Sequence, residues 1–241
     1  MNIIIPMAGN GQRFKDAGYK EDKAFIDVLG KPMFQAAIEN LNMDGDYFFI
    51  VRPEHEEKVW DITASFLYPN RRTVCIANEN DKGAAAACLR IEPRLQPNKP
   101  LIITNCDQII DWNSEDFLYY CADTMCDGCV ATFKADSPTH SYAATNSAPL
   151  DHLVKVIAEK VVISDNALCG VHYWRSTEMA MCSFAASLRY KPHYNGDYYI
   201  APTYNELIKL GNRILIYPTK GMTILGTPDK LKEYIENSST S

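Results

Sequence analysis

Residues 3 to 14 read IIIPMAGNGQRF, an apolar run followed by a loop of small residues that contains two glycines and an arginine. The apolar run has the length of a buried strand. Similar runs recur through the first half of the chain, and a segment with helical spacing follows or precedes each of them. The runs are NIIIPM, DYFFIVR, TVCIAN, PLIITN and GCVATF, and the helical segments include MFQAAIENLN, EEKVWDITASFL, GAAAACLRI and SEDFLYYCADT. This alternation predicts an α/β fold with a doubly wound, mostly parallel sheet covered on both faces.

The pattern changes near residue 140. Short apolar segments then predict strands at SYAAT, HLVKVIAE, KVVIS, ALCGVHYWR, RILIYP and GMTIL. Helices are expected at about 176–190 and 197–210 and after Pro228. We expect these strands to form short antiparallel additions to the same sheet. The chain is then a single domain of residues 1–237, followed by a disordered tail at 238–241.

Composition excludes several classes of protein. The chain has 241 residues and a net charge of −6, which argues against a nucleic-acid partner. It has neither a long apolar run nor a signal-like start, so we expect a cytoplasmic protein with no membrane partner. Its eight cysteines follow no regular spacing, which favours reduced thiols. The CxxC at 126–129 has no second metal-binding pair, and a turn before a strand explains it more simply than a zinc or redox site.

The loop after the first strand lies where an open parallel sheet binds ligands, at the carboxyl ends of its strands. Glycines allow close backbone approach, and free amide groups in such a loop can line an anion site. Arg13 adds a guanidinium that can grip phosphate oxygens. The loop matches neither a dinucleotide fingerprint nor a P-loop. A glycine-rich turn with a solvated arginine is the structural alternative.

The next stretch, GYKEDKAFIDVLGKPM at 18–33, resembles the nucleotidyltransferase superfamily of sugar-1-phosphate nucleotidylyltransferases and small cytidylyltransferases. Members open with AGxGxRF, a lysine within Pro-Lys-Pro, and VxGKPM. The resemblance continues nearly to the end of the chain, through KGAAAACL (82–89), TNCDQ (104–108), AEK (158–160), NGDYYIAPTYNELI (195–208) and LGTPDKL (225–231). It implies a Rossmann-like sheet of the GT-A type, with an NTP-binding half at about 1–135 and an acceptor-binding portion at about 136–220.

The implied reaction moves a nucleoside monophosphate group from an NTP to a phosphorylated small molecule and releases pyrophosphate. A sugar 1-phosphate or a phosphocholine-like compound would be the acceptor, in the setting of surface or capsule polysaccharide synthesis. The short carboxyl-terminal part resembles the smaller members and favours CTP. Because the acceptor phosphate is already an anion, the site needs cations rather than a general base. Mg²⁺ is the implied cofactor, since a hard cation bridges phosphate oxygens.

Site residues follow from matching the family pattern position by position. Arg13 and Lys23 are the catalytic candidates, and Asp107 is the candidate metal ligand. Asp197 is taken as the second metal ligand in place of an acid that the family pattern has and this sequence lacks, with a helix cap as its structural alternative. Residues expected to hold the nucleotide are Met7, Ala8, Gly9, Asn10, Gly11, Gly83, Ala84 and Asn105. Residues expected to hold the acceptor are Glu159, Lys160 and Asn195, with an exposed Glu159–Lys160 ion pair as the alternative.

The sequence departs from the family pattern in two places. Asp22 and Ala24 replace the prolines beside the lysine, and Glu21 adds a carboxylate that, with Asp22, would suit an acceptor carrying its own cationic group. The acid that larger relatives carry before Gly-Thr-Pro is absent. Two alternatives remain: a nucleotide-sugar glycosyltransferase, although Asn105 occupies the first position of its Asp-x-Asp, and a catalytically silent nucleotide-binding module. The sequence does not predict an oligomeric state.

Overall fold

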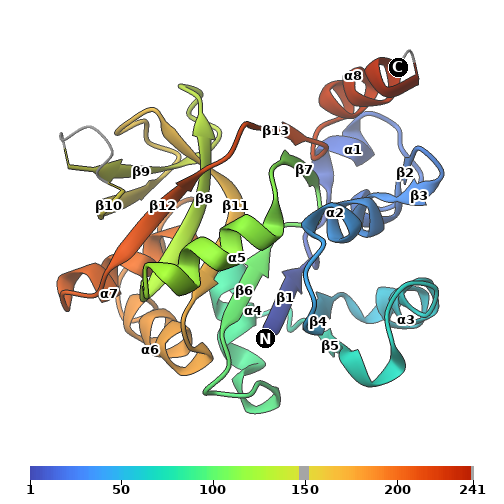
Figure 1. Cartoon of the computed structure of the whole chain (residues 1–241). Coiled ribbons are helices and arrows are strands. Elements are labelled where there is room, and N and C mark those ends of the chain that lie inside the picture. The colour runs from blue at the N-terminus through green and yellow to red at the C-terminus, as the bar shows by residue number, and fades with distance from the viewer. Residues whose placement is uncertain (147–151, 240–241) are drawn as a thin grey trace.

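A nine-stranded sheet forms the centre of the computed structural model, which describes residues 1–146 and 152–239 (Figure 1). The strand order is β10-β9-β11-β6-β1-β4-β5, with β8 beside β11 and β12 beside β8. The strands are β1 (Asn2–Pro6), β4 (Asp46–Val51), β5 (Arg72–Ile76), β6 (Leu101–Thr104), β8 (Gly128–Lys134), β9 (Ser141–Thr145), β10 (Val154–Glu159), β11 (Asn166–Trp174) and β12 (Ile214–Pro218). Two small antiparallel ladders, β2 (Asp27–Val28) with β3 (Lys31–Pro32) and β7 (Gln108–Asp111) with β13 (Gly221–Ile224), lie outside it.

The sheet is mostly parallel in direction. Strands β6, β1, β4 and β5 pair in parallel, as do β8 and β12. Strand β11 runs antiparallel to β6, β8 and β9, and β10 runs antiparallel to β9, so only β10 and β11 oppose the rest. The predicted doubly wound sheet with antiparallel additions is confirmed.

Helices cover both faces because the strands are apolar on both sides. Ile3 and Ile5 of β1 pack with α2 (Met33–Leu41), α3 (Glu56–Thr63) and α5 (Ser114–Asp123). Ile4, which points the other way, packs with α4 (Ala84–Arg90), α6 (Thr177–Ser187) and α7 (Tyr204–Lys209). The two remaining helices, α1 (Gln12–Asp16) and α8 (Pro228–Ser239), share a third cluster beside β2 and β3 (Figure 1).

Three boundaries differ from the prediction. The segment KVVIS forms no strand, since Lys160 adopts a positive φ of 54° and Val161 is 55% exposed. The helix expected at 197–210 begins only at Tyr204, after a 3₁₀ turn that contains Pro202. Residues 238 and 239 were predicted to be disordered but continue α8, which ends at Ser239, and 240–241 lie outside the described residues.

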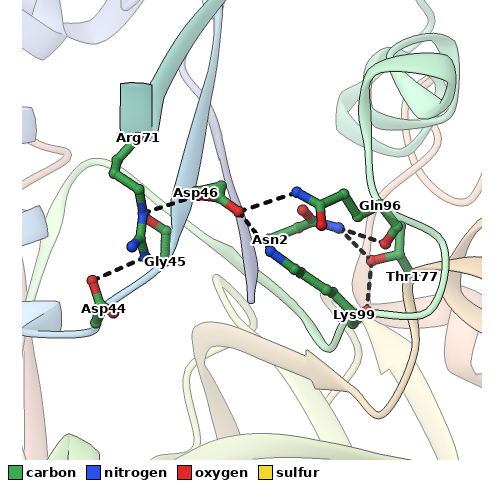
Figure 2. Close-up of polar contacts among 8 residues, drawn as sticks. All are labelled: Asn2, Asp44, Gly45, Asp46, Arg71, Gln96, Lys99 and Thr177. Carbon is green, nitrogen blue, oxygen red and sulfur yellow. Dashed lines mark hydrogen bonds and ion pairs between the residues drawn. The ribbon is translucent and has the colours of Figure 1, made fainter. Parts of the chain in front are cut away.

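A polar network locks the amino-terminal ends of the parallel strands (Figure 2). The Asp46 carboxylate, at the start of β4, pairs with Arg71 Nε at 2.9 Å and with Lys99 Nζ at 3.1 Å. Asn2 Nδ2, at the start of β1, donates to Thr177 Oγ1 at 2.8 Å. These groups connect the amino-terminal ends of the strands. Ligands of such sheets bind at the opposite side, where the carboxyl-terminal ends of the strands lie.

Two further expectations concern the cysteines and membranes. All eight cysteines are free thiols and only Cys182 is exposed. The Cys126 and Cys129 side chains of the CxxC are buried, with Cys129 on β8. Among the described residues no helix combines the length and apolarity that a bilayer crossing requires.

Candidate functional site

Lys23 and Asp107 meet at the carboxyl-terminal edge of the sheet. Lys23 begins a 3₁₀ turn in the segment after α1, and Asp107 lies in the connection between β6 and β7. The Lys23 Nζ atom is 2.9 Å from Asp107 Oδ2, and the two side chains are 26% and 21% exposed. Residues 84 positions apart in the sequence thus form a partly solvated ion pair at the edge where ligands bind in such sheets.

Two glycines allow this pair to form. A Cβ on Gly11 would lie 2.9 Å from Lys23 Cβ, and Gly11 also adopts a positive φ of 61°. A Cβ on Gly226 would lie 2.2 Å from Asp107 Oδ2. The neighbouring Leu225 amide donates to the Asp107 carbonyl at 2.8 Å. The backbones of the opening loop and of the LGTPDKL segment therefore pack directly against the Lys23–Asp107 ion pair.

The opening loop presents unused backbone donors. Within the described residues the amides of Gly9, Asn10 and Gly11 make no hydrogen bond, whereas the buried Met7 donates to Ile50 at 2.9 Å. Gly9 has open space around its Cα, and Gly9 and Asn10 are exposed. Such an array of free amides fits an anion.

Arg13 and Lys23 share one electrostatic environment. Arg13, on α1, is exposed, and its guanidinium makes no hydrogen bond or ion pair in the part of the chain that the structure describes. Burial disfavours the charged form of Lys23, but the Asp107 carboxylate outweighs it, so the pKa of Lys23 lies above its ordinary value. The positive charge of Arg13 acts against this rise in the pKa of Lys23.

Asn105 lies beside this pair on the same connection. Its amide donates to the carbonyl of Gly170 on β11 at 3.2 Å, and its side chain donates to Gln108 Oε1 at 3.2 Å. The Gly170 Cα approaches so closely that a Cβ there would lie 2.2 Å from Asn105 Nδ2. Asn105 itself is exposed at the sheet edge.

A second cluster forms around Gly83, which precedes α4. A Cβ on Gly83 would lie 2.6 Å from the Tyr198 carbonyl oxygen and 3.1 Å from Asp197 Cβ. The segment that carries Asp197 turns back at Asn195 and Gly196, both with positive φ. Asp197 does not cap a helix, because it lies in this turn, so that structural alternative is wrong.

Lys160 joins the second cluster through two tyrosines. Its ammonium lies 4.2 Å from the ring centre of Tyr194 and 4.8 Å from that of Tyr199, and it donates to Tyr199 Oη at 3.0 Å. Glu159 instead accepts a hydrogen bond from Ser141 Oγ, and burial raises the pKa of the Glu159 carboxyl. The exposed Glu159–Lys160 pair considered from the sequence is therefore not formed.

The structure brings the predicted residues together as two groups. The first group contains the opening loop, Arg13, Lys23 and Asp107. The second group contains Gly83, Ala84, Lys160, Asn195 and Asp197. Among the described residues no hydrogen bond or ion pair joins the two groups, and no group of three or more His, Cys, Asp or Glu side chains is arranged to hold a metal.

Three hollows lie outside the Lys23–Asp107 pair. One of about 820 Å³ is lined by residues that include Trp60 and Arg72, and one of about 650 Å³ is lined by residues that include His140 and Tyr234. The third, of about 410 Å³, lies beside His193. None of the three is lined by Lys23 or Asp107.

Comparison with solved structures gives matches over nearly the whole chain. A nucleoside-diphosphate-sugar pyrophosphorylase from Vibrio cholerae RC9 superposes with a TM-score of 0.80 at 23% identity, covering 97% of this chain and 99% of that one. A UDP-glucose pyrophosphorylase in complex with UDP-glucose gives 0.81 at 16% identity, covering 99% and 98%. The inositol-1-phosphate CTP transferase from T. maritima gives 0.77 at 12% identity, covering 97% and 93%.

This chain has the nucleotidyltransferase fold. The resemblance seen in the sequence is thus confirmed at the level of the fold. No protein-family model matches the chain. One curated relative, the bifunctional protein GlmU of Methanococcus vannielii, is 25% identical over 138 residues, which are 57% of this chain and 30% of that protein. The match therefore spans less than a third of that relative's length.

Sequence reasoning missed several residues around the site. Gly226 was read only as part of a motif, and its close approach to Asp107 depends on the β7–β13 ladder, of which only β13 was predicted. Arg52 and His55 were assigned no role, yet both contact the Lys23 segment through Asp22. One signal for Gly226 was present in the sequence: it is the glycine of the Gly-Thr-Pro motif, before which the usual acid is missing.

Proposed function

We propose that this chain is a nucleotidyltransferase that moves a nucleoside monophosphate group from an NTP to a phosphorylated small molecule and releases pyrophosphate. The observation that carries the proposal is the 2.9 Å Lys23–Asp107 pair, against which the backbones of Gly11 and Gly226 are packed. Three parts of the chain that are far apart in the sequence, at residues 11–23, 107 and 226, meet there, at the ligand-binding edge of a nucleotidyltransferase fold.

The opening loop supplies the anion site in this proposal. The free amides at Gly9, Asn10 and Gly11 would bind the β- and γ-phosphates, and the unpaired guanidinium of Arg13 would stabilise charge on the departing pyrophosphate. Lys23 would neutralise the α-phosphoryl group or the incoming phosphate. Its ammonium remains charged at neutral pH, since its pKa lies above the ordinary value.

Mg²⁺ fits this site only as an ion shared with substrate. Asp107 offers one carboxylate whose Oδ1 atom has no partner among the described residues, and no protein cage surrounds it. Mg²⁺ is commonly bound through one or two carboxylates, waters and substrate phosphates, which suits such a donor set. When bound, the ion would offset phosphate charge that side chains alone cannot. Asp197 is proposed as a second ligand and lies in the Gly83 group.

The division of labour along the chain is part of the proposal. Residues 1–135 would hold the NTP, with Gly83, Ala84 and Asn105 near the nucleoside, and residues 136–220 would hold the acceptor through Glu159, Lys160 and Asn195. The solved relatives act on or bind different nucleotides, since one is named for CTP and another holds UDP-glucose. CTP and a sugar 1-phosphate or phosphocholine-like acceptor remain our preferred pair, in the cytoplasmic supply of surface polysaccharide precursors.

A matrix of four NTPs against phosphorylated sugars, polyols and phosphocholine, each with Mg²⁺, tests the proposal by pyrophosphate release. We expect turnover for one pair and its loss in Lys23→Met. Lys20→Met is the matched control, because Lys20 is an exposed lysine three residues away with no partner among the described residues. Nucleotide binding without pyrophosphate for any acceptor would instead favour the silent module. Turnover only with a preformed nucleotide sugar would favour the glycosyltransferase.

A further inference from the structure

We propose that Asp22 is a positioning residue that directs the Lys23 side chain toward Asp107. The Asp22 carboxylate does so because it is bound by Arg52 and His55, on the side of the segment away from Asp107. Only the catalytic consequence of this placement rests on the proposed function. The placement itself rests on contacts within the chain.

The Asp22 carboxylate is bound from the neighbouring strand of the sheet. Its Oδ2 atom lies 2.7 Å from Arg52 Nη2 and 2.9 Å from His55 Nε2, and Oδ1 lies 3.5 Å from Lys15 Nζ. Arg52 directly follows β4, and His55 ends the 3₁₀ turn that leads into α3. The Lys23 segment is therefore fastened to the connection that follows the neighbouring parallel strand.

The chemistry of the three groups makes this a strong anchor. A carboxylate only accepts hydrogen bonds, so a hydrogen bond between His55 and Asp22 requires a proton on His55 Nε2. Arg52 Nη2, 3.0 Å from the same nitrogen, then donates to Asp22 and not to His55. The His55 ring is buried and lies edge-on to Phe25 at 4.8 Å between ring centres. Burial works against the charged carboxylate, but hydrogen bonds from His55 and Arg52 hold the pKa of Asp22 at about 2. Charge-assisted hydrogen bonds of this kind are stronger than neutral ones.

The side chains of Asp22 and Lys23 point to opposite sides of one short segment. Asp22 faces the β4 connection, and Lys23 faces Gly11 and Asp107. The Asp22 carbonyl also accepts the amide of Phe25 at 2.8 Å, which closes the 3₁₀ turn that begins at Lys23. Fixing the Asp22 side chain therefore fixes the direction in which the Lys23 side chain leaves the backbone.

The backbone of Asp22 has the conformation that a proline ring would impose. Its φ is −66° and its ψ is 144°, and its amide makes no hydrogen bond within the described part of the chain. A proline at position 22 would restrict this φ through its ring without losing a bond. The contacts of the Asp22 carboxylate and a proline ring are thus two ways to restrict the backbone at position 22. A proline there should therefore restore the placement of Lys23 that is lost when the carboxylate is removed.

The test measures how fast Lys23 is acetylated by an N-hydroxysuccinimide ester, read by peptide mass spectrometry on the whole protein. A paired, charged lysine reacts slowly, so Asp107→Asn should speed the labelling of Lys23. Asp22→Ala should speed it about tenfold, the effect of losing a hydrogen bond to a charged group. Asp22→Pro should restore slow labelling, and Arg52 then keeps Glu54 as a partner at 3.2 Å.

Glu21→Ala is the matched control. It removes the neighbouring Glu21–Lys58 pair, 2.7 Å long and exposed on both sides, and should leave Lys23 labelling unchanged. Three results would overturn the proposal: unchanged labelling in a folded Asp22→Ala, labelling in Asp22→Pro as fast as in Asp22→Ala, or no effect of Asp107→Asn. If Asp22→Ala does not fold, Asp22→Pro decides alone, with slow labelling of Lys23 in support and fast labelling against.

Labelling needs no substrate, so it separates the two proposals. A chain that releases no pyrophosphate but shows this labelling pattern loses the proposed function and keeps the positioning role. If the chain is active, Asp22→Ala should lower kcat and Asp22→Pro should recover it. A role confined to stability would not predict recovery by a residue that cannot pair with Arg52 or His55.

Discussion

Replacing Gly226 with alanine should damage the site while leaving the fold intact. The added Cβ would lie 2.2 Å from Asp107 Oδ2 and 3.1 Å from Asp107 Cγ, whereas an ordinary Cβ contact is 3.4–4 Å long. The carboxylate must therefore move by about 1 Å. Gly226 has no positive φ, so alanine adds no backbone strain. The displaced carboxylate is the one that pairs with Lys23, whose Nζ atom lies 2.9 Å from Asp107 Oδ2.

The effect on activity should be much larger than the effect on stability. A misplacement of about 1 Å in a catalytic arrangement can lower the rate about 100-fold. The Lys23–Asp107 pair is partly exposed, so its disturbance should lower the free energy of unfolding by only about 1 kcal/mol. Pyrophosphate release with the productive substrate pair, together with urea unfolding, measures both quantities.

Gly221→Ala is the matched control for this experiment. Gly221 lies on β13, in the same short strand region, and a Cβ there would meet nothing within 4 Å. It should retain the activity of the unaltered protein. A Gly226→Ala protein with unaltered kcat/KM would refute the reasoning, because the site would then tolerate a shifted Asp107.

Three further predictions concern the same residues. Lys23→Met and Asp107→Asn should each lower kcat for pyrophosphate release by about 10²-fold or more, since each removes charge from the reacting phosphates; a loss below tenfold would exclude a catalytic role. Gly83→Ala should lower the free energy of unfolding by at least about 1–3 kcal/mol in urea titration, because φ is 86° and the Cβ would meet the Tyr198 backbone at 2.6 Å; an unchanged midpoint would contradict the packing. The pKa of Asp22 is lowered from 3.8 to about 2, so its pairing stabilises the fold above pH ~4 and is lost as pH falls through ~2. Asp22→Asn should therefore cost about 1–2 kcal/mol at pH 5 and almost nothing once the pH is well below ~2, and a cost that did not depend on pH would count against the charged pair.

The sequence predicted those parts of the site that depend on strand ends. The loop after β1 and Asp107 after β6 both follow buried parallel strands, and β1 and β6 are neighbours in the sheet. Carboxyl ends of neighbouring parallel strands meet at one edge, so periodicity alone brings these loops together. The sheet and its two helical faces followed from the same alternation.

Contacts that depend on a long-range partner could not be predicted. The sequence related Asp22 only to the acceptor and not to partners within the chain, because those partners, Arg52 and His55, lie 30 and 33 positions further along. The segment KVVIS has strand composition but has no neighbouring strand among the described residues. A tertiary contact at Asp22, and the lack of such a strand partner at KVVIS, thus override the local pattern. The helix expected at 197–210 begins only at Tyr204, after the 3₁₀ turn that contains Pro202.

The structure also bears on the acceptor. Glu21 and Asp22 were expected to favour an acceptor with its own cationic group, but Glu21 pairs with Lys58 and Asp22 with Arg52 and His55. Both carboxylates thus already have cationic partners within the chain, and a preference for a cationic acceptor at these two residues stays a prediction.

A cationic acceptor would need another partner, and the candidate lies in the second cluster. Tyr194 and Tyr199 already place their ring faces against the ammonium of Lys160. If an acceptor phosphate draws Lys160 away from these rings, the vacated faces suit either a cationic group or the apolar face of a sugar. Charge on the acceptor is therefore expected to be distinguished at these tyrosines and not at the carboxylates beside Lys23. Tyr199→Leu should change the ratio of kcat/KM between a cationic and a neutral acceptor, and Glu21→Ala should leave that ratio unchanged.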